Sequence, residues 1–97
     1  MKLLIDELAS AELESIATYY AQVANKELAR TFVDEFERAA YLVLGNPHIG
    51  SALRGGQRKY SLRRFPYQII YQLAGNDLRI LALAHHRRKP GYWKKLP

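Results

Sequence analysis

The sequence predicts an α+β fold in which a helical hairpin packs on a mostly antiparallel four-stranded sheet, in the order β-α-α-β-β-β. Two patterns lead to this prediction. Apolar residues recur every three or four positions through the first half of the chain, whereas strand-forming runs separated by turn-forming residues fill the second half. The 97 residues suit a single domain spanning 1–97.

The first half begins with a short strand at Leu3–Ile5. Asp6 follows, and we expect its carboxylate to cap a helix by accepting from N–H groups of the first turn. Asn25 is expected to end this helix and to cap the next one. The apolar residues of the first helix lie on one face, as the spacing of a helix requires: Ala9, Leu13, Ile16, Ala17 and Tyr20.

The second helix has the clearest amphipathic pattern in the chain. Gly45-Asn46-Pro47 is expected to end it, with Gly45 at the C′ position and a proline shortly after. Because few residues join the two helices, they should form an antiparallel hairpin. We interpret the apolar stripes of both helices as core; that of the second comprises Ala29, Phe32, Val33, Phe36, Ala40 and Val43.

The second half reads as a loop followed by three strands. Residues 48–57 contain three glycines and are predicted to be a loop. The expected strands span residues 58–62, 67–73 and 78–84, with a turn at 74–77. The remaining residues, 85–97, form a basic and aromatic tail in which Pro90-Gly91 is expected to interrupt any regular element.

Charge is distributed very unevenly along the chain. Residues 1–53 contain four basic and eight acidic residues, a net charge of −4. Residues 54–97 contain eleven basic residues and one acidic residue, a net charge of +10. This asymmetry, together with the aromatic residues among the cations, indicates an anionic partner for the second half, although a merely solvated basic face is the alternative.

The composition also limits the chemistry. The chain has no cysteine, which favours a reducing compartment, and we expect a cytoplasmic protein. No apolar run approaches the ~18 residues of a membrane span, so no membrane partner is expected. His48 is far in sequence from His85-His86, and no acid follows these histidines at ligand spacing. We therefore predict neither a metal site nor a cofactor.

Two segments of the second half resemble the RelE/ParE toxin superfamily. The first is Arg63-Arg64-Phe65-Pro66-Tyr67-Gln68-Ile69-Ile70-Tyr71, and the second runs from Ile80 through His85-His86-Arg87-Arg88-Lys89-Pro90-Gly91 to Tyr92-Trp93. The earlier residues Ala9, Glu12-Leu13, Ile16 and Tyr19, and then Pro47, Gly50 and Leu53-Arg54, also match its pattern. The likeness covers nearly the whole chain.

This resemblance implies the toxin of a type II toxin–antitoxin pair, neutralised by a cognate antitoxin with which it forms a hetero-oligomer. RelE-like members cut messenger RNA on the ribosome without a metal, whereas ParE-like members poison DNA gyrase. We predict that the antitoxin is acidic, because the strongly basic half needs an anionic cover. A basic nucleic-acid-binding module without toxicity is a third, different possibility.

RNA cleavage would require a proton acceptor, cations for the phosphate and a proton donor. The candidates are Lys59, Arg63, Arg87, His86 and Tyr92. The RelE pattern, however, has a second lysine where this chain has Ser61, and a strand arginine where it has Gln68. Neither replacement can neutralise developing phosphate charge. The ParE-like mechanism is therefore favoured, with these candidate target-binding residues: Arg63, Arg64, Arg87, Arg88, Lys89, Tyr92 and Trp93.

Overall fold

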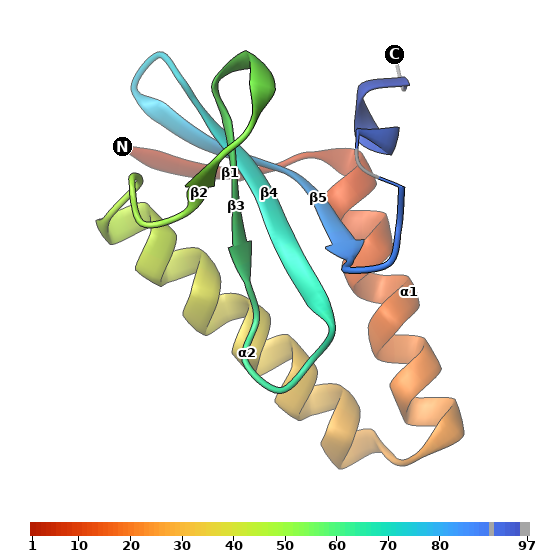
Figure 1. Cartoon of the computed structure of the whole chain (residues 1–97). Helices are drawn as coiled ribbons and strands as arrows, with labels where there is room; N and C mark the ends of the chain where they lie inside the picture. Colours follow the sequence, from red (N-terminus) through yellow and green to blue (C-terminus); the bar gives the residue numbers. More distant parts are fainter. Residues whose placement is uncertain (90, 96–97) are drawn as a thin grey trace.

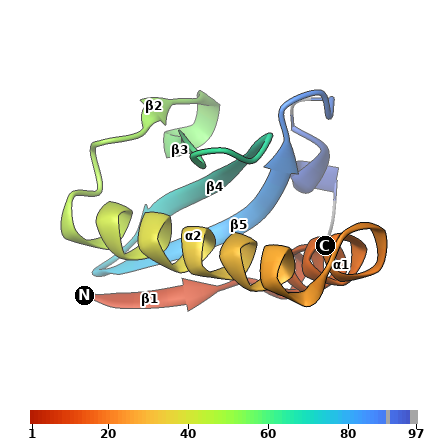
Figure 2. The same ribbon diagram turned by 90° about the horizontal axis from the view of Figure 1, so that it is seen from below.

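A computed structural model describes residues 1–89 and 91–95 of the chain. Two helices form a hairpin that covers one face of a twisted sheet (Figures 1 and 2), so the predicted α+β class is confirmed. Within the described residues, neither helix combines the length and the apolarity needed to cross a bilayer. The elements in chain order are β1 (Lys2–Ile5), α1 (Glu7–Val23), α2 (Lys26–Gly45), β2 (Ser51–Ala52), η1 (Arg54–Gly56), β3 (Gln57–Ser61), β4 (Tyr67–Ala74), β5 (Asp77–His85) and η2 (Tyr92–Lys95).

The sheet has five strands in the order β1-β5-β4-β3-β2, with β1 parallel to β5 and the other pairs antiparallel. The sequence predicted four strands, and that count is wrong. The additional strand, β2, lies within the expected loop 48–57 and pairs only Ser51 with Lys59 and Ala52 with Arg58. A strand of two residues shows no alternation of apolar and polar residues, so only its pairing with β3 reveals it.

The helix ends confirm one predicted cap and correct two others. Asn25 accepts from the backbone N of Leu28 at 2.7 Å, as expected. Asp6 occupies the N-cap position of α1, but its side chain accepts no hydrogen bond from the N–H groups of the helix. The carboxylate instead accepts from the guanidinium of Arg79 at 3.1 and 2.7 Å. The two hydrogen bonds to a charged guanidinium are stronger than a cap bond to a backbone N–H group, so the carboxylate binds Arg79. Gly45 is still helical, and Asn46 is the C-cap residue.

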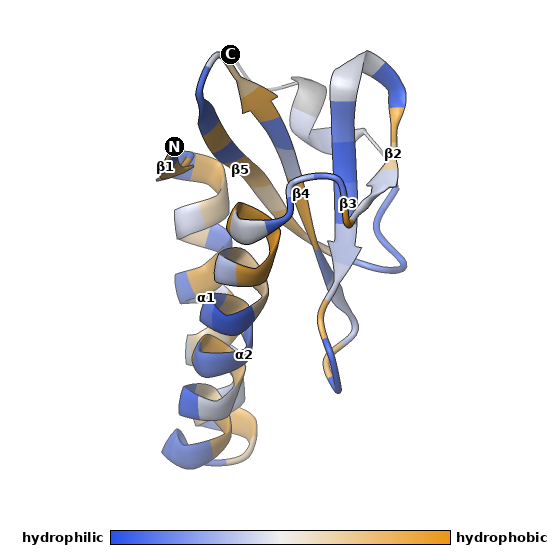
Figure 3. Cartoon of the chain, turned by 90° about the vertical axis from the view of Figure 1, so that its left-hand side faces the viewer, coloured by the Kyte–Doolittle hydropathy of each residue, from blue (hydrophilic) through white to orange (hydrophobic). Residues whose placement is uncertain are grey.

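The main core lies between the helical hairpin and the sheet. The apolar stripes of α1 and α2 face β4 and β5, which confirms their interpretation as core. Figure 3 shows the contrast between these hydrophobic strands and the hydrophilic outer side of α2. The cluster comprises the buried residues Ala9, Phe32, Phe36, Ala39, Ala40, Val43, Leu62, Phe65, Ile69, Tyr71, Leu78, Ile80 and Leu83.

A second, smaller cluster covers the opposite face of the sheet. Ile70, Ala82 and Ala84 are buried there. The pairing of β4 with β5 shifts register after Ile70, so that Ile70 opposes Ala82 whereas the next residue opposes Ile80. The tail element η2 lies against this second face, which the sequence did not predict. The partly buried residues of this cluster are Leu8, Leu53, Leu81, Tyr92 and Trp93.

The segment between α2 and β3 is held to the core by a buried tyrosine. The hydroxyl of Tyr71 donates to the carbonyl O of Pro47 at 2.8 Å and accepts from the backbone N of Gly50 at 3.0 Å. Burial raises the pKa of this phenol, so it stays protonated and able to donate. Gly50 is buried so closely that an added Cβ would lie 2.5 Å from the Tyr71 hydroxyl and 2.6 Å from the carbonyl O of Lys59.

We therefore predict that Gly50→Ala lowers the free energy of unfolding by roughly 1–3 kcal/mol, the usual cost of overpacking. Urea denaturation would measure the loss. Gly45→Ala is the matched control, because a Cβ there meets nothing within 4 Å and alanine favours the helix. Equal stabilities of the two variants would contradict the close packing described around Tyr71.

Candidate functional site

Exposed cations gather where the β3–β4 loop meets the segment that follows β5. Both segments lie at the same end of the sheet (Figure 1), because Tyr67 at the start of β4 pairs with His85 at the end of β5. The backbone N of His86 donates to the carbonyl O of Pro66 at 2.9 Å and joins the two segments. We call this surface the cationic end; it consists of Arg63, Arg64, Arg87, Arg88 and Lys89, all exposed.

The β3–β4 loop holds its two arginines in a fixed conformation. Leu62 and Phe65 on either side of them are 6% and 7% exposed and anchor the loop in the core. Between these anchors, the backbone N of Arg63 donates to Oε2 of Glu35 at 2.6 Å. Arg64 has a φ of 70°, in the left-handed region that a non-glycine residue adopts only at some cost in energy. This turn directs two consecutive arginines to the surface.

The segment after β5 is ordered by its own contacts. The backbone N of Arg87 donates to Nδ1 of His85 at 3.0 Å, and the backbone N of Arg88 donates to the carbonyl O of His85 at 2.9 Å. The ring of His85 packs edge-on against Tyr67, with centroids 5.1 Å apart. His85 therefore has a structural position, whereas His86 is exposed.

Three arginines elsewhere in the described residues have partners. The two ion pairs found there join Arg38 to Glu35 and Arg79 to Asp6, both at 2.7 Å. Arg58 donates to the carbonyl O of Gly50 at 2.7 Å. The five residues of the cationic end take part in neither ion pair, so their positive charge is available to an anionic partner.

The second face of the sheet has a different character. Lys59 is exposed there on β3, beside Ile70 of β4. The next row along the strands pairs Ser61 with Gln68, and Gln68 with Ala84. This row contains no charge. Lys59 is therefore separate from the loops that carry Arg63 and Arg87, and no second cation lies in these two rows of residues.

The aromatic residues of the tail are bound to the rest of the fold. The hydroxyl of Tyr92 donates to Oε2 of Glu12, while Oε1 of the same carboxylate accepts from the backbone N of Leu83 at 2.9 Å. Burial and this hydrogen bond to a carboxylate raise the pKa of Tyr92. The indole N–H of Trp93 donates to Oε1 of Gln57 at 2.9 Å. Arg88 lies over the Tyr92 ring, 4.0 Å from its centroid.

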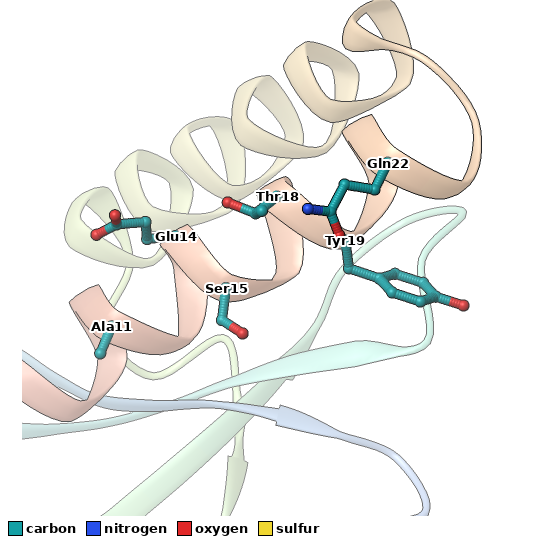
Figure 4. A pocket seen from close by; sticks show the side chains of 6 residues that line it. All are labelled: Ala11, Glu14, Ser15, Thr18, Tyr19 and Gln22. Atoms are coloured by element: carbon teal, nitrogen blue, oxygen red, sulfur yellow. The ribbon is translucent and has the colours of Figure 1, made fainter.

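A groove runs beside α1 toward the cationic end. One part, of about 530 Å³, is lined by Ser15, Ile16, Tyr19, Tyr20, Pro66, Tyr67 and His85. A neighbouring part of about 250 Å³ shares four of these residues and ends at Arg88 and Tyr92. On the outer side of the helix, Figure 4 shows a further depression, from which the ring of Tyr19 extends away from α1. Tyr19 is 55% exposed.

Comparison with known proteins identifies the family. Residues 3–90 match the family model of the ParE toxin of type II toxin–antitoxin systems, parDE. The chain belongs to the ParE toxin family. A solved structure described as the chromosomal ParDE TA system from P. aeruginosa has a chain with the same fold, at a TM-score of 0.78 and 23% identity, covering 88% of this chain and 95% of that one. No curated protein matches the sequence significantly.

In this ParE-family chain the five residues proposed for RNA cleavage are spread over several elements. Lys59 lies on the second face, Arg63 in the β3–β4 loop, and His86 and Arg87 after β5. Tyr92 is bound to Glu12. By contrast, the structure brings together five of the seven proposed target-binding residues at the cationic end. Tyr92 and Trp93 are partly buried in the second cluster, and the Tyr92 ring lies under the guanidinium of Arg88.

Sequence reasoning missed the carboxylates that organise this ParE surface. The sequence alone assigns no structural contact to Glu35 or Glu12, because a helical pattern does not show which loop will reach them. Glu35 binds both the guanidinium of Arg38 and the backbone of Arg63. The hydrogen bond from Arg38 is the main reason why the pKa of Glu35 is lowered. The one available signal was its position, three residues before Arg38 on the same helix.

The lowered pKa of Glu35 predicts a pH-dependent contribution to stability. A depressed carboxyl pKa stabilises the fold above the unfolded value of about 4.3, and this contribution disappears as pH falls through the folded value. Glu35→Gln should lower the free energy of unfolding at pH 7 by about 1–2 kcal/mol, and the difference from wild type should shrink below about pH 4. Glu37→Gln, at an exposed position of α2, is the control. Identical pH profiles of the two variants would contradict the assigned role.

Proposed function

We propose that this ParE-family chain inhibits DNA gyrase, that its cationic end contacts the target, and that a cognate antitoxin neutralises it. The observation that carries the choice of mechanism is the uncharged row on the second face, in which Ser61 pairs with Gln68 and Gln68 with Ala84. The resemblance to RelE-like nucleases would require cations in place of Ser61 and Gln68.

The contacts of the tail support the same choice. A ribosome-dependent nuclease would use the late tyrosine and nearby cations around one phosphate, where removal of a charged donor typically costs about 10²–10³ in rate. Here the hydroxyl of Tyr92 is held by Glu12, and its raised pKa disfavours a phenolate. On the second face, neither the row of Lys59 nor the next row of Ser61, Gln68 and Ala84 contains a second cation. The chain is therefore proposed to act by binding and not as an enzyme, in the compartment that contains gyrase, the cytoplasm.

The electrostatics of the cationic end support its role in target binding. Gyrase acts on DNA, so the complex that the toxin must recognise is strongly anionic. Exposed arginines and a lysine without ion-pair partners favour association with such a complex and speed the encounter. An inert basic module would have the same charge but would not arrest growth.

Induction of the chain without its antitoxin should test the target. We expect growth arrest, an SOS response and trapped gyrase–DNA breaks, with messenger RNA left intact. With Arg87→Ala, growth arrest should require at least about tenfold more inducer, because this substitution removes an exposed cation that faces an anionic target. Arg87→Lys should restore part of the growth inhibition.

Arg54→Ala, at an exposed position far from the cationic end, is the control for the removal of one charge. Cleaved messages without DNA breaks would overturn the gyrase proposal in favour of the nuclease, and normal growth would favour the inert module. Trp93→Ala is a less clean test than Arg87→Ala, because the indole packs in the second cluster and bonds to Gln57.

The groove beside α1 is proposed to receive an acidic antitoxin segment with an apolar anchor. Its aromatic walls offer the kind of apolar contact that dominates binding energy, and Arg88 at its end complements an acidic residue. Tyr19→Ala should weaken antitoxin binding by about 1–3 kcal/mol, measured by calorimetry. Tyr41→Ala on α2, where the ring is 66% exposed, is the matched control. An equal loss of affinity in both variants would show that the groove is not the preferred site.

A further inference from the structure

We infer that the cationic end is a preorganised site for a nucleic-acid backbone, formed by the Arg63-Arg64 loop and the Arg87-Arg88-Lys89 segment, so that the chain contacts the DNA of its target complex directly. This inference rests on the proposed function for its biological setting. Its physical basis is the two segments, their contacts and their charge.

The two segments are joined and individually fixed. The hydrogen bond from the backbone N of His86 to the carbonyl O of Pro66, at 2.9 Å, sets their relative position. The backbone N of Leu62 donates to the carbonyl O of Tyr67 at 2.9 Å and closes the base of the β3–β4 loop. A site whose backbone is already ordered loses less entropy when it binds, so its arginines can hold a ligand more effectively than those of a mobile tail.

Glu35 and Arg64 act as positioning residues for this loop. The carboxylate of Glu35 accepts from the backbone N of Arg63 and leaves the guanidinium of Arg63 to the surface. The left-handed backbone at Arg64 reverses the chain direction between two buried anchors, Leu62 and Phe65. Backbone strain at a surface arginine is unusual, and it places the second cation beside the first.

The chemistry of the surface favours a phosphodiester backbone over a protein. Protein interfaces depend on aromatic or apolar anchors near their centre, whereas contacts to phosphates come mainly from arginine, lysine and backbone groups. At the cationic end the large apolar residues Leu62 and Phe65 point into the core, and none of the five residues of this surface is apolar; the exposed ring of Tyr19 belongs to the neighbouring groove beside α1. Only Pro66 adds an exposed apolar surface to the loop.

The surroundings of the cationic end differ between its two sides. Asp34 and Glu35 line a hollow of about 350 Å³ between α2 and the Arg63-Arg64 loop together with Arg38, Arg63 and Arg64, so the charge on that side is mixed. Glu35 is already engaged by Arg38 and by Arg63. The open approach is the side that faces the segment after β5, where Arg87 and Lys89 extend the positive surface.

The test is fluorescence anisotropy with a labelled duplex DNA of mixed sequence, with no gyrase present, at several salt concentrations. The wild-type chain should bind with a Kd of about 10⁻⁴ to 10⁻⁶ M near physiological salt, and the affinity should fall as salt rises, as expected for phosphate binding. Arg63→Ala/Arg64→Gly should weaken binding at least about tenfold and lower the salt slope by ~0.9 for each phosphate that is no longer neutralised. Glycine is chosen at position 64 because it adopts the left-handed backbone without strain.

The control is Lys2→Ala/Arg54→Ala, which removes the same charge from the opposite end of the sheet, where Lys2 pairs with Asp77. Circular dichroism should show both variants folded. Absence of salt-dependent binding by the wild type, or equal weakening in the two double variants, would overturn the inference. If the wild type inhibits gyrase but does not bind DNA, the cationic end contacts protein and only this inference fails. If it binds DNA but leaves gyrase active, the proposed function fails and this inference stands.

Discussion

The packing of Phe32 against the rings around it is the interaction on which the rest of the structure depends. Phe32 is fully buried on α2 and contacts Tyr20 of α1, Phe65 of the β3–β4 loop and Tyr67 of β4, with centroid separations of 5.5, 5.1 and 5.6 Å. Aromatic pairs of this kind add to the energy of simple burial. One ring thus joins both helices, the sheet and the loop that carries two of the surface arginines.

This arrangement explains how a small protein can display charge without disrupting its core. Phe65 enters the cluster around Phe32, and its neighbours Arg63 and Arg64 are thereby forced to the surface. Tyr67 continues the cluster to His85, whose ring nitrogen accepts from the backbone of Arg87. The two cationic segments are therefore positioned by a continuous series of packed side chains. A change in the core at Phe32 would reach the surface through this series.

The acidic half of the chain has a corresponding structural role. Three of its carboxylates bind residues of the basic half: Asp6 binds Arg79, Glu35 binds the backbone of Arg63, and Glu12 binds Leu83 and Tyr92. These contacts join the helices to the sheet. They engage the acids in ion pairs and hydrogen bonds, while most arginines near the end of the sheet stay exposed. The charge asymmetry of the sequence becomes an asymmetry of the surface because the other five acids of residues 1–53 are exposed on α1 and α2, whereas the cationic end is formed by loops at the end of the sheet.

The sequence by itself determined the α+β class, the two helices and their buried faces, the three later strands and the family. These features depend on local periodicity, turn residues and the order of elements along one chain, which a linear pattern records directly. Only the tertiary structure decided the strand β2, the use of Asp6 for Arg79 in place of a helix cap, and the docking of Tyr92 and Trp93 on the second face. Each of these is a contact between residues distant in sequence, and its partner is set by packing that no local pattern contains. The same is true of the cationic end, whose two segments are separated in sequence by the two strands β4 and β5. They meet only because β4 and β5 are antiparallel neighbours.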